Sequence, residues 1–298
     1  MTNAQDKVEA QTRPAGKRLI VRLDDMGFCH AANMAVKRIL EEGVCTSISV
    51  IVNTPWLDEA VAILREHPEV SVGVHLTLNS EWREYRWGPV RPYTEVPSLV
   101  DEFGRFFGSR KELMAHNPKV EEVARELRAQ IDLALRKGLK VSYCDYHMGA
   151  AVSTPEFQAA LEKLAAEYRI GISRYFGETD TPSVYSVPPE GKRETGISII
   201  EGLTESGLHL FVCHPGLDTP EMAVMTDLNV TGLKNMAAHR QAETDLLCDP
   251  GFRRAIERGG LELVGYAALR ADGLERMKRP DSVGPYGPAV PESRVSDK

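Results

Sequence analysis

The sequence lacks an excess of basic residues, because 36 lysines and arginines stand against 43 aspartates and glutamates, giving a formal net charge of -7. Proteins that neutralise nucleic-acid phosphates usually carry the opposite balance, so we expect no nucleic-acid partner. Long hydrophobic runs are also missing, since no stretch approaches the roughly 18 apolar residues of a membrane span. Residues 1–17 are polar, without the apolar segment of a secretory signal. We therefore expect no membrane partner.

Cysteine is scarce and forms neither a disulfide framework nor a metal-binding motif. The five cysteines are odd in number and widely spaced, and no two form a CxxC pair. Most lie in apolar, strand-like surroundings, where a reduced and buried thiol is typical. This usage indicates a reducing, cytoplasmic location. The residues are Cys29, Cys45, Cys144, Cys213 and Cys248.

Two motifs of common enzyme classes are absent. There is no GxSxG elbow of a serine hydrolase, so covalent catalysis through a serine is disfavoured. No glycine-rich phosphate loop follows the first apolar segment, which argues against a doubly wound nucleotide-binding sheet.

Short apolar segments alternate with helical patterns along most of the chain. The strand-like segments are 19–23, 46–52, 70–78, 141–146, 208–213 and 261–266, with a seventh expected around 172–175. Helical periodicity covers 31–42, 119–137, 155–168 and 232–247. The strand-like segments are too apolar for a sheet with one face exposed to solvent, which is typical of a parallel sheet that is covered on both sides or closed into a barrel. We predict an α/β fold of one domain, a (β/α) barrel-like structure that is distorted or incomplete.

Three segments fall outside this alternation. Residues 1–17 and the proline-rich residues 271–298 are expected to be flexible, leaving 18–270 as the folded domain. Between them, residues 79–118 form a long insert with seven of the chain's twenty aromatic residues. Long loops in compact domains are usually functional or disordered, and the aromatic content argues against disorder. We predict that the insert lies over the active-site pocket.

Five polar residues stand at the ends of predicted strands. Asp24 and Asp25 end the first strand, and His75, His147 and His214 lie in or just after later strands. The carboxyl ends of parallel strands meet at one edge of a sheet, where such folds place their sites. A helix N-cap is the simpler explanation of the aspartates, and a lone strand histidine is usually a core residue. Three histidines at matching strand ends favour a shared site.

This set of side chains suits metal-assisted hydrolysis. One carboxylate with two imidazoles binds a divalent ion and leaves positions open for water and substrate. A second carboxylate can accept a proton from water, and a further histidine can protonate a departing amine. Adjacent strand residues point in opposite directions, so only one of Asp24 and Asp25 is expected to face the metal easily.

The motifs LDDMGFCHAANMAV, VGVHLTLN, CDYH, VCHPG and AHRQAETDLLCDPGF, in this order over about residues 18–269, resemble the YdjC-like carbohydrate deacetylases. The resemblance implies a barrel-like fold and hydrolysis of an N-acetyl group from an amino sugar. It also implies one divalent metal ion, Mg²⁺ or Zn²⁺, on Asp25, His75 and His147. Asp24 then resembles the general base, and His214 the residue that stabilises or protonates the leaving group.

Four further residues are candidates for contact with substrate, each with a simpler alternative. Asp145 could orient a ligand histidine or belong to a turn. Arg240 matches the family pattern, but an ion pair with Glu243 on a solvated helix face explains it equally. Trp82 and Trp87 could stack on a sugar ring, or could pack the insert onto the barrel or into a homodimer contact.

The function predicted from the sequence is removal of an acetyl group from an N-acetylated sugar or oligosaccharide, a small carbohydrate substrate. Two alternatives stay open. The same metal site could hydrolyse another small amide or ester, or the barrel could bind carbohydrate without turnover. Presence of all five polar residues argues against the second, because a binding module needs no base beside a metal.

Overall fold

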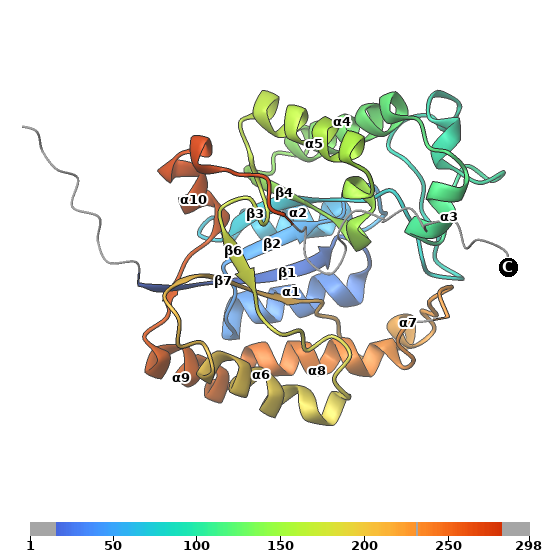
Figure 1. The fold of residues 1–298 in the computed structure, drawn as a ribbon. Coiled ribbons are helices and arrows are strands. Elements are labelled where there is room, and N and C mark those ends of the chain that lie inside the picture. Colours follow the sequence, from blue (N-terminus) through green and yellow to red (C-terminus); the bar gives the residue numbers. More distant parts are fainter. Residues whose placement is uncertain (1–15, 231, 282–298) are drawn as a thin grey trace, which may run out of the picture.

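Seven strands of this computed structural model form one parallel sheet, described over residues 16–230 and 232–281. The strands are β1 (Lys17–Met26), β2 (Ser47–Val50), β3 (Ser71–Leu76), β4 (Val141–Tyr146), β5 (Gly171–Ile172), β6 (Glu178–Asp180) and β7 (Gly207–Cys213). Their spatial order is β5-β4-β3-β2-β1-β7-β6, and a short β8 (Glu262–Leu263) pairs with the start of β1. The sheet is curled into a half-barrel (Figure 1).

Helices cover the convex side of this sheet, with α4 and α5 above it and α6, α8 and α9 below it in Figure 1. In chain order, the described helices are α1 (His30–Glu42), α2 (Leu57–Arg65), α3 (Arg110–Ala115), α4 (Val120–Arg136), α5 (Pro155–Tyr168), α6 (Lys192–Glu201), α7 (Pro220–Ala223), α8 (Met236–Cys248), α9 (Pro250–Gly259) and α10 (Tyr266–Asp272). Within the described part of the chain, none of them combines the length and apolar character needed to cross a membrane.

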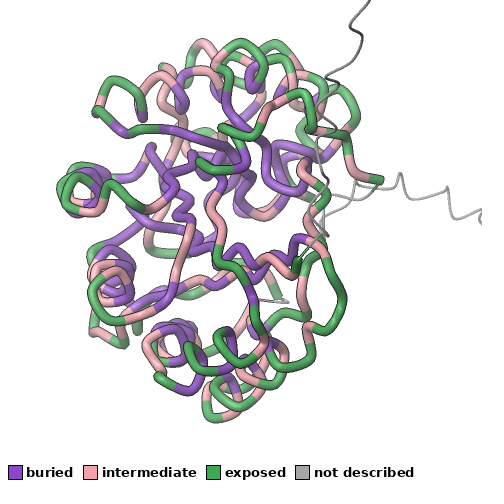
Figure 2. The backbone as a smooth tube through the Cα atoms, turned by 90° about the vertical axis from the view of Figure 1, so that its left-hand side faces the viewer, coloured by how far each residue is buried: buried purple, intermediate pink, exposed green. Residues whose placement is uncertain are grey.

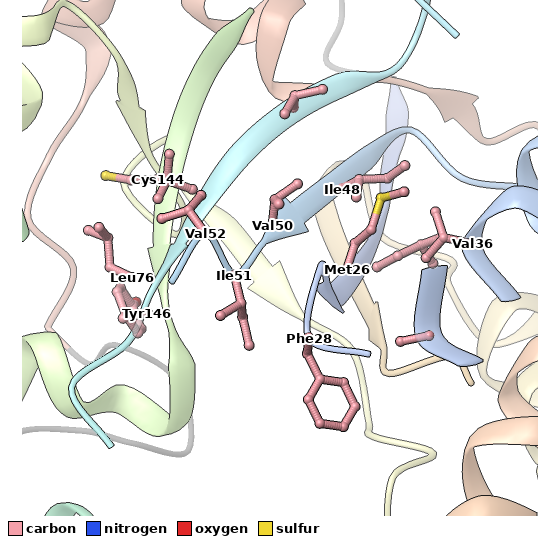
Figure 3. Close-up of a cluster of buried hydrophobic side chains, with 14 of the residues drawn as sticks. Met26, Phe28, Val36, Ile48, Val50, Ile51, Val52, Leu76, Cys144 and Tyr146 are labelled. Atoms are coloured by element: carbon pink, nitrogen blue, oxygen red, sulfur yellow. The ribbon is translucent and has the colours of Figure 1, made fainter. Parts of the chain in front are cut away.

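The outer face of the sheet carries the main hydrophobic core. Its strand residues are apolar and buried against the helices, and include Leu19, Val21, Leu23, Ile48, Val50, Val74 and Leu76. Figure 3 shows Met26, Ile48 and Val36 gathered where β1 and β2 meet α1. Strands β1 to β5 and β7 are buried along nearly their whole length, whereas the helices expose their outer sides (Figure 2). Removal of this apolar area from water is the main stabilising contribution.

A separate hydrophobic cluster fills the half-barrel toward the amino ends of the strands. Tyr266, at the start of α10, stacks on Tyr143 with ring centroids 4.1 Å apart, and Ile20 and Leu210 belong to the same cluster. Gly73 makes room for this packing, because a Cβ there would lie 2.4 Å from the Tyr143 ring. This cluster closes one end of the half-barrel and leaves the carboxyl ends of the strands open.

The predicted barrel-like α/β fold of one domain is confirmed. Some predicted elements are shorter than expected: the strand at 261–266 is β8 followed by α10, and the one at 172–175 is β5, which ends before the left-handed residue Arg174. The polar strand β6 and helix α6 were not expected. The strands are also less uniformly apolar than predicted, because alternate residues point into the half-barrel and many of these are polar.

The predicted flexible ends fall mostly on residues 1–15 and 282–298, which lie outside the described residues. Where the structure describes the proline-rich segment, it lies on the domain. The Lys278 amide donates to the Tyr175 carbonyl at 2.8 Å, and Arg279 pairs with Glu162 on α5.

Candidate active site at the carboxyl ends of the strands

A bulge at the end of β1 turns both adjacent aspartates toward the same cavity. Leu23 is in register with Ile48 and Met26 with Val50, so two residues of β1 stand opposite one of β2. Asp25 has φ of 70°, in the left-handed region that non-glycine residues rarely adopt. Both carboxylates therefore line the cavity. A regular strand would have pointed these side chains in opposite directions, and the bulge lets both reach the cavity; that only one of them faces the metal stays a prediction.

Three side-chain atoms that could bind a metal ion converge beside this bulge. Asp25 Oδ1 lies 3.4 Å from His75 Nε2 and 3.3 Å from His147 Nδ1. The two histidine nitrogens are themselves 3.4 Å apart. Asp25 is on β1, His75 is on β3, and His147 directly follows β4, so three strands on the same side of the sheet each deliver one donor atom, with β2 lying between β1 and β3. All three residues are buried.

Each histidine is oriented by a carboxylate at its other ring nitrogen. His75 Nδ1 lies 2.9 Å from Asp145 Oδ1, and His147 Nε2 lies 2.9 Å from Glu81 Oε2. When these nitrogens donate to the carboxylates, lone pairs remain on the two nitrogens that face Asp25. Carboxylate–histidine pairs of this kind orient metal ligands in proteins. Asp145 thus lies behind His75 and does not line the cavity.

The donor set fits a divalent cation on two grounds. Asp25 Oδ1 is buried and accepts no hydrogen bond from any described residue, although its partner oxygen accepts one from Arg240 at 2.7 Å. Within the described chain, the carboxylates of Asp24, Asp25 and Asp145 form ion pairs with two guanidinium groups, Arg22 and Arg240, and that of Glu81 pairs with His147. These four carboxylates and two guanidinium groups together carry two negative charges when the histidines are neutral. Two imidazoles and a carboxylate are suitable ligands for such an ion.

The same excess of negative charge acts on the histidines. Burial opposes protonation of both rings, but the facing carboxylates outweigh it. Glu81 and Asp25 raise the pKa of His147 to about 9, and Asp145 with Asp24 raises the pKa of His75 well above its ordinary value. A divalent cation and two ring protons are alternative ways to neutralise this cluster.

Asp24 has a different partner from Asp25. Arg22, two residues earlier on β1, donates from Nε and Nη2 to the two oxygens of Asp24 at 2.7 and 2.8 Å. Burial alone would raise the pKa of Asp24, but the Arg22 guanidinium outweighs it and lowers that pKa below its usual value. Asp24 is therefore ionised at neutral pH and can accept a proton.

His214, at the end of β7, completes the arrangement on the far side of Asp24. Its Nε2 lies 3.9 Å from Asp24 Oδ2, and its side chain lines the cavity. Burial lowers the pKa of His214 below its ordinary value, so the ring is neutral near pH 7. The structure thus brings together all five residues that were expected at the strand ends.

These groups open into a cavity of about 690 Å³, large enough for a small sugar. The insert contributes part of its wall through Glu81, Trp82 and residues 109–111. Trp82 is only 2% exposed and Trp87 only 4%, and Trp87 is not among the lining residues. Trp87 packs instead against Phe28 and Tyr85.

Arg240 and Glu243 do not form the solvated ion pair that was considered as an alternative. Both are buried in α8 and have separate partners. Arg240 donates to Asp25, and its guanidinium lies over the rings of Phe28 and Trp82. Glu243 pairs with Lys192 and accepts from the His214 amide.

Sequence reasoning missed Arg22 and Glu81. Arg22 had a usable signal, because residues two apart on a strand share a face and Asp24 was already a candidate. Glu81 lies in the insert, where no periodicity predicts the direction of a side chain, so only its position six residues after His75 pointed toward the site.

Comparison with known proteins agrees with this picture. A model of the YdjC-like protein family matches residues 18–258. The chain belongs to this family. A relative from Brevibacillus brevis, named carbohydrate deacetylase, is 29% identical over 85% of this chain and 99% of its own length. Another of that name from Thermus thermophilus is 32% identical over 81% and 90%.

One solved structure shares the fold of this YdjC-like chain. It belongs to a protein of Enterococcus faecalis V583 described as a candidate for cellobiose-phosphate cleavage. The TM-score is 0.71 at 23% identity, and the match covers 85% of this chain and 99% of the other.

Proposed function

We propose that this protein is a metal-dependent hydrolase that removes an acetyl group from an N-acetylated sugar or oligosaccharide. The observation that carries the proposal is the convergence of Asp25, His75 and His147 beside an ionised Asp24, all facing one cavity. The family and the names of the relatives support a carbohydrate deacetylase.

In this proposal, Asp25 Oδ1, His75 Nε2 and His147 Nδ1 hold one divalent cation, Zn²⁺ or Mg²⁺. When bound, the ion would supply Lewis acidity to the acetyl carbonyl and to the attacking water. Arg240 holds the second oxygen of Asp25, which directs the first toward the ion. Asp145 and Glu81 hold the imidazoles in the tautomers that leave the ligand nitrogens free.

Asp24 and His214 transfer the protons of the reaction. Asp24 accepts a proton from the attacking water, and Arg22 keeps that carboxylate ionised and oriented. The departing sugar nitrogen needs a proton to leave as an amine. His214 is neutral, so it relays to that nitrogen the proton that Asp24 has taken from the water; its Nε2 lies 3.9 Å from Asp24 Oδ2 at the cavity wall.

The test is release of acetate from a panel of N-acetylated sugars by protein loaded with Zn²⁺ or Mg²⁺ and by protein treated with a chelator. We expect turnover that chelation abolishes and metal restores. His75→Ala should lose both bound metal and turnover, whereas the matched control His67→Ala, at a half-buried residue of the loop after α2, should keep both. If the protein hydrolyses simple amides or esters but no sugar, the proposed substrate class is wrong. If it binds metal or sugar without any turnover, the proposed enzymatic function is wrong.

The cytoplasmic location, the absence of a nucleic-acid partner and a homodimer contact of the insert stay predictions from the sequence.

A further inference from the structure

The cavity has a second wall whose role the proposed chemistry does not use. It is formed by residues 181–186, which follow β6, and we name it the β6 wall. Among its lining residues is Tyr185, which is half-buried. The tryptophans of the insert are almost fully buried, so Tyr185 is the more accessible aromatic ring at this cavity.

Tyr185 stands next to the leaving-group side of the site. Its ring meets the His214 ring edge-on, with centroids 5.2 Å apart and planes at 67°. In an N-acetylated sugar, the atom that His214 protonates is the nitrogen attached to the pyranose. An aromatic ring that contacts His214 therefore lies beside the position that the pyranose must occupy.

The β6 wall is fixed from behind by a buried lysine. Lys192 is 0% exposed, and its ammonium group donates to the carbonyls of Val184 and Tyr185 at 2.9 and 2.8 Å. Its third partner is Glu243 Oε1 at 2.6 Å. Val184 is itself fully buried in the main core. The backbone on both sides of the Tyr185 side chain is thus held in place.

Glu243 connects this anchor to His214. Its other carboxylate oxygen accepts a hydrogen bond from the His214 backbone amide at 2.6 Å. One buried ion pair therefore joins the β6 wall, α6, α8 and the end of β7. A buried ion pair is weak support for stability, because an apolar pair of similar volume often stabilises as well. Its multiple contacts suit a positioning role better.

We propose that Tyr185 is the platform on which the sugar ring stacks, and that the Lys192–Glu243 pair is a positioning device that holds this platform in register with His214. The ligand class is a pyranose with an N-acetyl group, whose C–H face packs on the aromatic ring. This inference rests on the proposed deacetylase function and adds the site of the sugar ring to it.

The first experiment compares Tyr185→Ala with Tyr185→Phe, which keeps the ring. With an N-acetylglucosamine disaccharide, the KM of Tyr185→Ala should rise about tenfold, as expected from the loss of an aromatic contact, while kcat changes little. Tyr185→Phe should stay near the wild type. An unchanged KM in Tyr185→Ala, or an equal loss in Tyr185→Phe, would overturn the platform.

Binding of the same disaccharide is also measured by calorimetry, so that the two proposals can fail separately. If the wild type binds the sugar but releases no acetate, the deacetylase function is rejected. The dissociation constants of the Tyr185 variants then still decide whether the ring is the platform.

The second experiment removes the positive charge of the anchor with Lys192→Met. We expect a lower kcat together with a higher KM, each by about tenfold or more, with the metal content unchanged. Arg193→Met is the matched control, because Arg193 is exposed and pairs with Asp249, the N-cap residue of α9. Glu243→Gln keeps an acceptor for the His214 amide, so its kcat and KM should change less than those of Lys192→Met. If Lys192→Met does not fold, Glu243→Gln is tested in its place. Wild-type kcat and KM in both anchor variants, or losses no larger than in Arg193→Met, would overturn the positioning role.

Discussion

The two faces of the parallel sheet are both buried, yet they are built from opposite chemistry. The outer face is apolar and packs against helices. Toward the carboxyl ends of the strands, the inner face carries charged and hydrogen-bonded side chains in one network. Its members are Arg22, Asp24, Ser49, His75, Asp145, Ser173 and the hydroxyl group of Tyr143. The outer face gains stability from burial of area, whereas the inner face keeps excess negative charge out of water, which costs stability unless a cation compensates it. The outer face therefore provides most of the stability of the fold, and the inner face provides the residues of the proposed reaction.

The sharpest test of this division is Asp24→Asn on the inner face. We expect kcat for deacetylation to fall by roughly 10²–10⁴, the usual contribution of a general base, with bound metal retained. Metal analysis and steady-state kinetics on the same preparation check this. If Asp24→Asn loses the metal and Asp25→Asn keeps it, the two aspartates have exchanged roles. Asparagine suits position 25 because it tolerates the left-handed backbone there.

The counterpart on the outer face is Ile48→Ala. Ile48 is fully buried in the main core, and truncation should lower the free energy of unfolding by about 2–5 kcal/mol. Metal affinity and kcat should stay unchanged below the melting temperature. Denaturant unfolding gives the first quantity and kinetics the second. A loss of metal in this variant would break the proposed division between the faces.

Metal addition should stabilise only a protein with an intact inner face. At a free metal concentration of 100 times Kd, a ligand that binds the native state alone adds about 2.7 kcal/mol to the free energy of unfolding. We expect this gain in the wild type and in Ile48→Ala, but not in Asp25→Asn. Thermal unfolding with and without metal measures it. An equal gain in Asp25→Asn would place the ion elsewhere.

The smallest expected effect concerns a residue that touches neither substrate nor metal. Asp145→Asn removes the charge behind His75 and should weaken metal affinity by about 10–100-fold, as is usual for carboxylates that orient ligand histidines. Competition with a chromophoric chelator measures the affinity. Asp132→Asn, on the helix α4, serves as a control outside the cavity, and similar losses in both variants would remove the orienting role of Asp145.

Much of this molecule could be predicted from local patterns in the sequence. The apolar segments predicted β1 to β4 and β7, because strands that are buried on their outer face leave a run of branched residues. The positions of Asp24, Asp25, His75, His147 and His214 at strand ends predicted that they would meet, because parallel strands end at one edge of the sheet.

Other features were decided only by the tertiary structure. The bulge that turns Asp25 inward depends on the register between β1 and β2, which no single segment specifies. Arg240 and Lys192 come from helices far along the chain, so their partners Asp25 and Glu243 follow from helix packing and not from spacing. The sequence by itself determined which side chains could do the chemistry. Tertiary packing determined which carboxylate each cation holds, because hydrogen bonds between distant segments leave no periodic signal in the sequence.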